Sequence, residues 1–391
     1  RATQSTRQPG SAFKPVVYAA ALERGWKMSD LVEDVRRDYG GYAPRNFRGE
    51  YWGPVTMKHA LAHSLNSGTV WLLRRIGVES AYEMGLRLGI TSLSPSDLNL
   101  ALALGAITRG VTPLEMAKAY VPFASGGVLF EPFAVSEVRD AEGALLYRHR
   151  PDARRVLSRE VAYFITDMLQ AAVAYGTGTS AAIGRPQAGK TGTTDNNESA
   201  WFVGYTPSLV AAVYIGNDDG TPLAGGGGVI AAPVWGRFVA EALRDTPAEH
   251  FPVPANVRTG YPVDIFSGLA ANENCRYREY DSFVWGQEPR EPAPCALGEG
   301  VLPVPFPNQD GTLGNSATVP GDLGISGLPA PTGDGAATPG PFFSVPGGGA
   351  ASGIPEPDSS EEERYDLLAP GSDHGGIPGP ILEHAFHPES E

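Results

Sequence analysis

The chain has 391 residues, of which 42% are hydrophobic, enough for one or two domains with a sizeable core. The formal net charge of −14 is uneven: residues 301–391 hold 13 Asp and Glu against one Arg, or −12, whereas the remainder holds 31 against 29 Lys and Arg, or −2. The part expected to fold is thus nearly neutral, which argues against nucleic-acid binding. No run of about 18 apolar residues is present, so we expect no transmembrane helix in this sequence.

The first predicted element is a short buried helix over residues 13–22, preceded by a turn at Pro9-Gly10. Ser11 stands at the start of this helix, three residues before Lys14, so the two side chains share a face of it. A buried lysine with a lowered pKa can take the proton of a serine hydroxyl and make it a nucleophile. Alone, this spacing arises by chance about once in a chain of this length, and a capped helix with a solvated lysine explains it as well.

Residues 26–51 are polar and are predicted to form a loop, and three helices follow, over residues 55–63, 69–76 and 79–88. Between the first two helices stands Ser64-Leu65-Asn66. Side chains two residues apart would point to different sides of a continuous helix, whereas a break between helices can aim both one way. Ser67 and Gly68 are expected to supply that break. An ordinary polar connection between helices is the alternative.

The second half begins with a capping box, Thr112-Pro113-Leu114-Glu115, whose helix should end at Gly126-Gly127. A hairpin with its turn near residues 140–143 and a helix capped by Ser158 come next. The remaining predicted elements are strands over residues 187–193, 200–205 and 209–215 and a helix over residues 233–243. Helices followed by an antiparallel meander and a closing helix predict an α+β fold, with a sheet packed by helices and a helical subdomain.

A third polar motif, Lys190-Thr191-Gly192-Thr193-Thr194, lies on the first of these strands. Lys-Thr-Gly has odds of about one in ten of a chance match in such a chain, and an edge-strand lysine with a bulge glycine would explain it. The three motifs in this order, however, are those of penicillin-binding proteins and serine β-lactamases. On these motifs and on the sequence segments at residues 7–15 and 189–194, the chain resembles the transpeptidase domain of class A penicillin-binding proteins. The likeness covers residues 1–245 and continues more loosely to Cys295.

The resemblance implies acyl transfer through an ester on Ser11, in which a D-Ala-D-Ala bond is attacked, D-Ala leaves and a second stem peptide accepts the acyl group. Lys14 would be the base for the Ser11 hydroxyl. Ser64 would relay a proton to the leaving amine, and Asn66, which has a donor and an acceptor, would bind a substrate amide.

On the strand, the charge of Lys190 would lower the pKa of the catalytic lysine and attract the substrate carboxylate. The hydroxyls of Thr191 and Thr193 would hold that carboxylate, and Gly192 would let the substrate backbone approach. The backbone N–H groups of Ser11 and Thr193 would form an oxyanion hole, worth about 3–4 kcal/mol of barrier. No cofactor and no metal is implied. Peptidoglycan stem peptides and β-lactam antibiotics are the implied ligands.

Three alternatives share this chemistry. A β-lactamase needs a carboxylate that activates water for deacylation, but the only Asn between the second and third motifs is Asn99, preceded by Ser96-Asp97-Leu98, and no Glu-x-x-Leu-Asn is present. We therefore expect persistent acylation by penicillin. A penicillin-acylated sensor would not join peptides, and a D,D-carboxypeptidase would use water in place of the acceptor amine.

The two cysteines, Cys275 and Cys295, lie in a polar region predicted as loop. They are either unrelated thiols or one disulfide, and we predict the disulfide, which persists outside the cytoplasm. Three regions are expected: a transpeptidase domain over residues 1–250, a small cysteine-containing extension over residues 251–300, and a disordered tail over residues 301–391, where 15 Pro and 16 Gly preclude a core.

The sequence does not begin with Met and reads as a fragment. In the family, a membrane anchor and a glycosyltransferase domain come before this domain, on the extracytoplasmic face of the membrane. The resemblance also implies strands just ahead of the Ser11 helix, and only ten residues stand there. We therefore expect those strands to be missing, an unpaired sheet edge, and lower stability and slower acylation than in a chain extended upstream.

Overall fold

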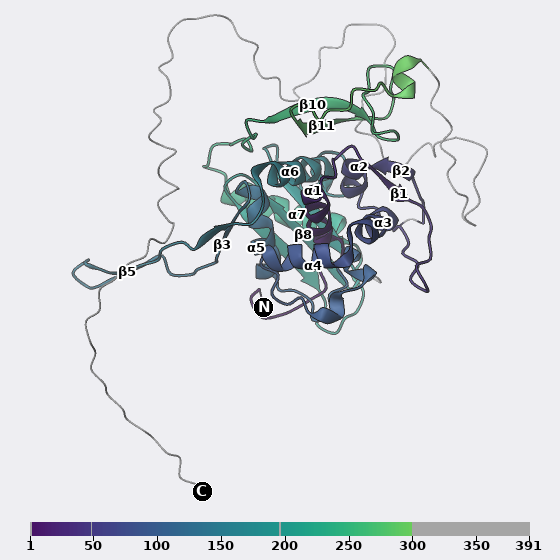
Figure 1. Cartoon of the computed structure of the whole chain (residues 1–391). Helices are drawn as coiled ribbons and strands as arrows, with labels where there is room; N and C mark the ends of the chain where they lie inside the picture. Colours follow the sequence, from purple (N-terminus) through teal and green to yellow (C-terminus); the bar gives the residue numbers. More distant parts are fainter. Residues whose placement is uncertain (1, 48, 195–196, 299–391) are drawn as a thin grey trace, which may run out of the picture. The chain divides into compact units, whose positions relative to one another are not determined.

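A computed structural model describes residues 2–47, 49–194 and 197–298 of the chain (Figure 1). The predicted α+β fold is confirmed, with helices packed on both sides of an antiparallel sheet. The tail expected to be disordered, residues 301–391, lies outside the described residues, so that expectation stays a prediction.

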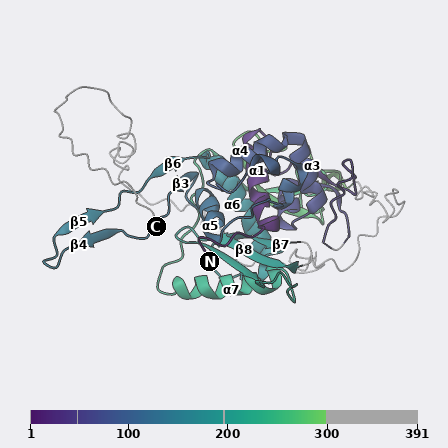
Figure 2. The same ribbon diagram turned by 90° about the horizontal axis from the view of Figure 1, so that it is seen from below.

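The central sheet has three antiparallel strands in the order β7-β8-β9, close to the predicted bounds: Ala188–Thr193, Ser199–Tyr205 and Val210–Gly216. Strand β8 is buried along its length, as its aromatic and β-branched residues favour. Helix α7 (Gly227–Ala242) covers one face, and α5 (Pro113–Ala124) and α6 (Arg159–Ala174) pack on the other (Figure 2). Strand β9 pairs only with β8 among the described residues, and every residue in it is half-buried.

The helix that follows Ser11 is the centre of the core. A 3-10 turn, η1 (Gly10–Phe13), leads into α1 (Lys14–Glu23), which is buried almost all round, as expected of a helix with apolar residues on every side. It is packed by α6 and by the three α-helices of the helical subdomain. The elements of that subdomain are α2 (Met57–Ala62), α3 (Asn66–Ile76), α4 (Val78–Arg87), η2 (Pro95–Asp97) and η3 (Leu100–Leu104).

Two predictions in the first half are wrong. The region read as loop contains a strand, β1 (Leu31–Asp34), which pairs with β2 (Gly53–Thr56), so α2 starts later than predicted, after a cap by Thr56. Between α2 and α3 the predicted break is present, but Ser67 and Gly68 lie inside α3. The break comes from Ser64, whose φ of 57° is in the left-handed region that few residues other than glycine adopt.

The second half follows the prediction except in the hairpin and in the start of α7. The capping box of α5 and the Ser158 cap of α6 form as predicted, and the short helix η4 spans Thr179–Ala181. The predicted hairpin is split, because β3 (Val128–Phe130) pairs with β6 (Ala153–Arg155). Within it, β4 (Glu137–Arg139) and β5 (Leu145–Arg148) pair around the predicted turn and form an exposed arm (Figure 2). Helix α7 begins at Gly227, six residues before its predicted start at residue 233.

The extension after residue 250 is more ordered than predicted. It forms an antiparallel pair, β10 (Val257–Asp264) and β11 (Arg278–Val284), and a short helix, η6 (Pro294–Leu297). Cys275 is buried in a small apolar cluster and is joined to Cys295, with Cα atoms 5.0 Å apart. Three residues of the extension, Phe251, Ile265 and Tyr277, belong to the main hydrophobic core. The extension is therefore packed against the helical part rather than standing apart as a separate region.

Candidate active site

Lys14 is the point at which the first two motifs meet. Its side chain is completely buried at the start of α1, and its Nζ donates to Ser64 O at 2.6 Å, Ser64 Oγ at 3.2 Å and Asn66 Oδ1 at 2.7 Å. Burial lowers the pKa of Lys14 well below its ordinary value, and the charge of Lys190 lowers it further. A lysine whose pKa is lowered in this way loses its proton more readily than an exposed lysine, and its neutral form can act as a base.

Ser11 lies in η1, one turn before Lys14, and is half-buried. Among the described residues no hydrogen bond joins the two side chains, because the Lys14 amine is directed toward Ser64 and Asn66. The turn is held by backbone contact with β7: Gly10 has a φ of 55°, and a Cβ there would lie 2.6 Å from Thr193 O. Glycine at this position thus permits the Ser11 turn to pack directly on the strand of the third motif.

The conformation of Ser64 explains why Ser64 and Asn66 both contact Lys14. The left-handed backbone of Ser64 ends α2 and turns its carbonyl oxygen and its hydroxyl oxygen toward Lys14. Asn66 then starts α3, and its Nδ2 donates to Arg45 O at 2.7 Å. The two side chains point toward the same lysine, as the predicted break requires.

Two residues under this motif were not predicted from the sequence. Asp34, at the end of β1, accepts hydrogen bonds from Asn46 Nδ2, Trp52 N and Gly68 N. Asn46 Oδ1 in turn accepts from the backbone N of Asn66 at 2.8 Å. This buried pair satisfies the first N–H groups of α3, which otherwise lack partners. Both lie in the region read as loop, where Leu31-Val32 is followed by two acidic residues and shows no alternation that would have revealed β1.

Lys190 on β7 is also completely buried, and burial lowers its pKa to about 7. The two threonines that follow are held in place by neighbours. Thr191 Oγ1 lies 2.7 Å from Thr177 Oγ1, and Thr193 Oγ1 accepts from Gly227 N at 3.0 Å, which leaves the Thr193 hydroxyl proton to donate elsewhere. Thr177, just after α6, is a further contact that sequence reasoning did not identify.

The structure shows a reason for glycine at position 192 that differs from the predicted approach of the substrate backbone. A Cβ at this position would overlap the carbonyl oxygen of Pro9 and come within 3.1 Å of Ala12 Cβ. Glycine is required here because β7 packs closely on the serine turn, and this requirement holds with or without a bound substrate. The three motifs, far apart in sequence, thus surround one buried pair of lysines.

Comparison with known proteins agrees with this arrangement. Residues 1–240 match the penicillin binding protein transpeptidase domain, and the chain therefore belongs to this family. It is 38% identical over 276 residues to penicillin-binding protein 1A of Neisseria lactamica, an alignment that covers 66% of this chain and 34% of that protein. The chain thus spans about a third of the length of this curated relative.

Solved structures show the same fold. Penicillin-binding protein 1A from Haemophilus influenzae has a TM-score of 0.66 at 30% identity, covering 75% of this chain and 50% of that one. The PonA1 protein from Mycobacterium tuberculosis in complex with penicillin V has a TM-score of 0.59 at 28% identity, covering 68% and 75%. In the part of the chain that the structure describes, no helix is long and apolar enough to cross a membrane. No cluster of metal-ligating side chains occurs within those same residues either.

Proposed function

We propose that this chain is a peptidoglycan D,D-transpeptidase that forms peptide cross-links through an ester on Ser11 and is acylated there by penicillin. The observation that carries the proposal is the burial of Lys14 beside Lys190, with polar contacts only to Ser64 and Asn66. A buried lysine with a lowered pKa, one turn from a half-buried serine, is an activating base for that serine. Membership of the family and the penicillin V complex of PonA1 support the same choice.

The reaction can be written with every proton placed. Lys14 takes the Ser11 hydroxyl proton, Oγ attacks the carbonyl carbon between the two D-Ala residues, and the C–N bond breaks. The leaving D-Ala nitrogen takes a proton relayed through Ser64. An amine of a second stem peptide then attacks the ester carbonyl carbon, and the bond from that carbon to Ser11 Oγ breaks. The proton lost by the amine passes through Lys14 to Ser11 Oγ, and a new amide links the two peptides. The backbone N–H groups of Ser11 and Thr193 would stabilise the oxyanion in both steps.

The substrate would be held along β7. Lys190 would attract the carboxylate of the terminal D-Ala, and the free hydroxyl proton of Thr193 would donate to it. Asn66 would bind the amide that precedes the scissile bond. Beyond Thr193, a hollow of about 410 Å³ is lined by residues that include Arg7, Arg109 and Thr194. Its two guanidinium groups outnumber its one carboxylate, that of Glu198, and so suit the acidic part of a stem peptide.

The β-lactamase alternative is disfavoured by the contacts of Asp97 and Asn99, the residues considered above in place of a Glu-x-x-Leu-Asn motif. Asp97 Oδ1 accepts from Thr108 N and Thr108 Oγ1 at 2.8 and 2.6 Å, and Asn99 Oδ1 caps the following turn at Ala101 N. Both side chains are committed to local structure. We therefore expect penicillin to stay bound as an ester. A D,D-carboxypeptidase and a penicillin-acylated sensor remain the competing functions.

The complete protein, we infer, carries this domain on the extracytoplasmic face of the cell membrane, together with a glycosyltransferase domain and an anchor. The bond between Cys275 and Cys295 suits that compartment, because disulfides persist there. Peptidoglycan stem peptides and β-lactams are the proposed ligands.

The test is labelling with a fluorescent penicillin, comparing the chain with its Ser11→Ala form and with Ser67→Ala as a control in α3. Labelling should disappear only in Ser11→Ala, and mass spectrometry should find the adduct on Ser11. An adduct on another serine would refute the proposal. Supplying a donor pentapeptide with and without an acceptor amine then separates the three functions: cross-linked product indicates a transpeptidase, released D-Ala alone a carboxypeptidase, and neither a sensor.

A further inference from the structure

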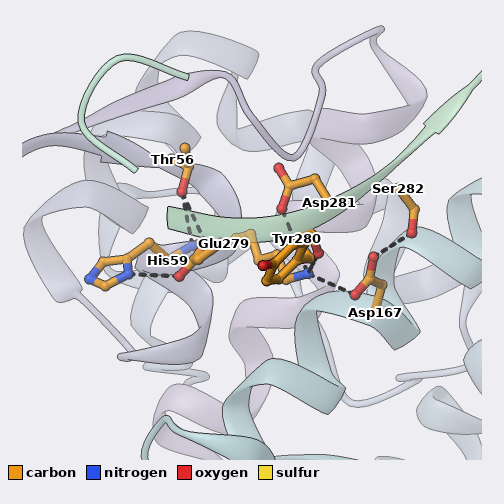
Figure 3. A network of polar contacts seen from close by, with 8 residues as sticks. Thr56, His59, Asp167, Glu279, Tyr280, Asp281 and Ser282 are labelled. Atoms are coloured by element: carbon orange, nitrogen blue, oxygen red, sulfur yellow. Dashed lines mark hydrogen bonds and ion pairs between the residues drawn. The ribbon is translucent and has the colours of Figure 1, made fainter. Parts of the chain in front are cut away.

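A group of buried charges lies between α2, α6 and β11 (Figure 3). We call it the buried charge cluster; its members are Lys58, His59, Asp167, Glu279 and Asp281. Four of the five side chains are no more than 5% exposed, and Asp167 is 17% exposed. Charges this far from water are costly unless partners satisfy them. The cluster plays no part in the chemistry described above.

Lys58 holds α2 to both neighbouring elements. Its Nζ donates to Asp167 Oδ1 of α6 at 2.8 Å and to the backbone oxygen of Tyr280 in β11 at 2.5 Å. The second oxygen of Asp167 accepts from Ser282 Oγ at 2.6 Å, which closes the link between α6 and β11. The three elements are thus joined through one ammonium group (Figure 3).

His59 makes the second connection. Its Nδ1 lies 2.8 Å from Glu279 Oε1, and the other Glu279 oxygen accepts from Thr56 Oγ1 at 3.3 Å. Thr56 is the cap of α2, so Glu279 contacts the start of the helix as well as its first turn. One carboxylate of the extension therefore fixes both the position and the rotation of α2.

Asp281 differs from Glu279 in one respect. It lies two residues further along the same strand and is equally buried, but neither of its carboxyl oxygens has a hydrogen-bond partner, and Lys58 Nζ is 3.6 Å away. Its burial raises its pKa to about 7, whereas the pKa of Glu279 is lowered by His59 and Lys58 despite burial. The strand thus offers one carboxyl group with hydrogen bonds and one held by a longer ion pair with Lys58, a matched pair for experiment.

The cluster is connected to the second motif by the short helix α2. His63 N donates to His59 O, and the left-handed Ser64 is closed by hydrogen bonds from Ser64 N to Leu61 O and from Leu65 N to Ala60 O. A shift or rotation of α2 therefore moves the two Ser64 atoms that face Lys14.

The C-terminal end of α2 is also tied to the third motif. Thr177 N donates to Ala62 O, and Thr177 Oγ1 lies 2.7 Å from Thr191 Oγ1 on β7. A change in the position of α2 would therefore affect both the second and the third motif.

We propose that Glu279 is a positioning residue for the acyl-transfer reaction: through His59 and Thr56 it fixes α2 and thereby the placement of Ser64 against Lys14. The extension after residue 250 is then part of the catalytic unit. This inference rests on the proposed function for its effect on rate, but the effect on the structure of α2 does not. Glu279 touches no substrate, and its role is carried entirely by contacts within the protein.

The experiment compares Glu279→Gln with Asp281→Asn in the full chain, using penicillin acylation. We expect Glu279→Gln to lower the acylation rate constant at least tenfold, with the dissociation constant of the non-covalent complex within threefold of the unaltered chain. Asp281→Asn should change neither by more than threefold. Equal slowing by the two substitutions would indicate a general loss of stability and overturn the proposal, as would an unaltered rate in Glu279→Gln.

A double variant covers the case in which Glu279→Gln does not fold. His59→Asn together with Glu279→Gln replaces the charged pair by two amides that can hydrogen-bond at the same place. We expect this variant to fold and to acylate within tenfold of the unaltered chain, and faster than Glu279→Gln alone where that folds. A folded double variant without acylation would overturn the proposal.

A readout independent of chemistry separates this inference from the proposed function. Amide hydrogen exchange over residues 60–66 should be faster in Glu279→Gln than in Asp281→Asn. If penicillin acylates neither the unaltered chain nor the variants but this difference is found, the proposed function fails and the positioning role stands. The same exchange in both variants would refute the positioning role.

Discussion

At the scale of single residues, the site depends on two buried lysines with different tasks. In the proposed mechanism, Lys14 must be neutral to accept a proton, whereas Lys190 must be charged to attract a carboxylate. Burial lowers the pKa of both, and for Lys190 the resulting value is about 7. The charge of Lys190 also lowers the pKa of Lys14, which suits a base and an anion-binding group side by side.

This difference predicts the pH dependence of acylation. The second-order rate constant reports the groups of the free enzyme. It should fall as pH rises above about 7, because Lys190 then loses the charge that attracts the penicillin carboxylate. In Lys190→Arg the alkaline limb should move up by two pH units or more, since a guanidinium stays charged. Stopped-flow measurements between pH 5 and 10 would check this, and a wild-type profile that stays flat from pH 7 to 9 would contradict it.

Asp34 offers a second prediction at this scale. In Asp34→Asn an amide replaces the carboxylate that accepts from Asn46, Trp52 and Gly68. We expect a loss of about 1–3 kcal/mol in the free energy of unfolding and slower acylation, because at least one buried donor loses its partner. Glu33→Gln is the control: its side chain is partly exposed and pairs with Arg37, an interaction worth less than about 1 kcal/mol. Similar denaturant midpoints for the two variants would show that Asp34 is not a support of the site.

At the scale of elements, the packing of β7 on the serine turn is the feature most open to test. Gly192→Ala should destabilise the chain by about 1–3 kcal/mol and suppress acylation, since the new methyl group would overlap Pro9 O. Gly225→Ala is a suitable comparison, because its nearest neighbour is Val229 Cβ at 3.2 Å. Thermal unfolding and penicillin labelling of both variants would check the prediction. Full labelling of Gly192→Ala would show that the turn and strand can separate without cost.

The sequence allowed the strands β7 to β9, the helices α5 and α6 and the central α1 to be predicted, because their apolar periodicity and caps are local signals. The site's eight named residues could be chosen because three motifs carry them. What could not be predicted depends on distant contacts. Asp34 has meaning only once β1 pairs with β2, the left-handed Ser64 only once Lys14 approaches it, and Glu279 only once β11 lies over α2. Polar residues that are buried by pairing look like loop residues in a sequence.

The disulfide gives a prediction for the extension. Its cysteines are 20 residues apart, and closing a loop of this size stabilises by about 3 kcal/mol in the chain-entropy model. Replacing both cysteines by Ser should loosen β10 and β11 and slow acylation to a smaller degree than Glu279→Gln does. Thiol counting in unreduced, denatured protein from an oxidising compartment should find none. Two free thiols per chain would show that the bond does not form.

At the scale of the whole molecule, the folded part and the acidic remainder are expected to be independent. A chain that ends at residue 300 loses most of the negative charge but none of the residues that line the proposed site. Its penicillin acylation rate and melting temperature should match those of the 391-residue chain within error. A loss of more than threefold in rate would assign the last 91 residues a part in the reaction.

The exposed arm of β4 and β5 is a site at which a protease could divide the domain into two fragments. Its turn, near Asp140, falls between the second and third motifs, so a protease cut there would leave the serine and its base on one piece and Lys190 on the other. Because β7 and β8 pack against η1 and α5, the pieces would stay together without a covalent link. The nicked protein would then behave as a two-part enzyme, whose activity is lost on dilution and regained on mixing.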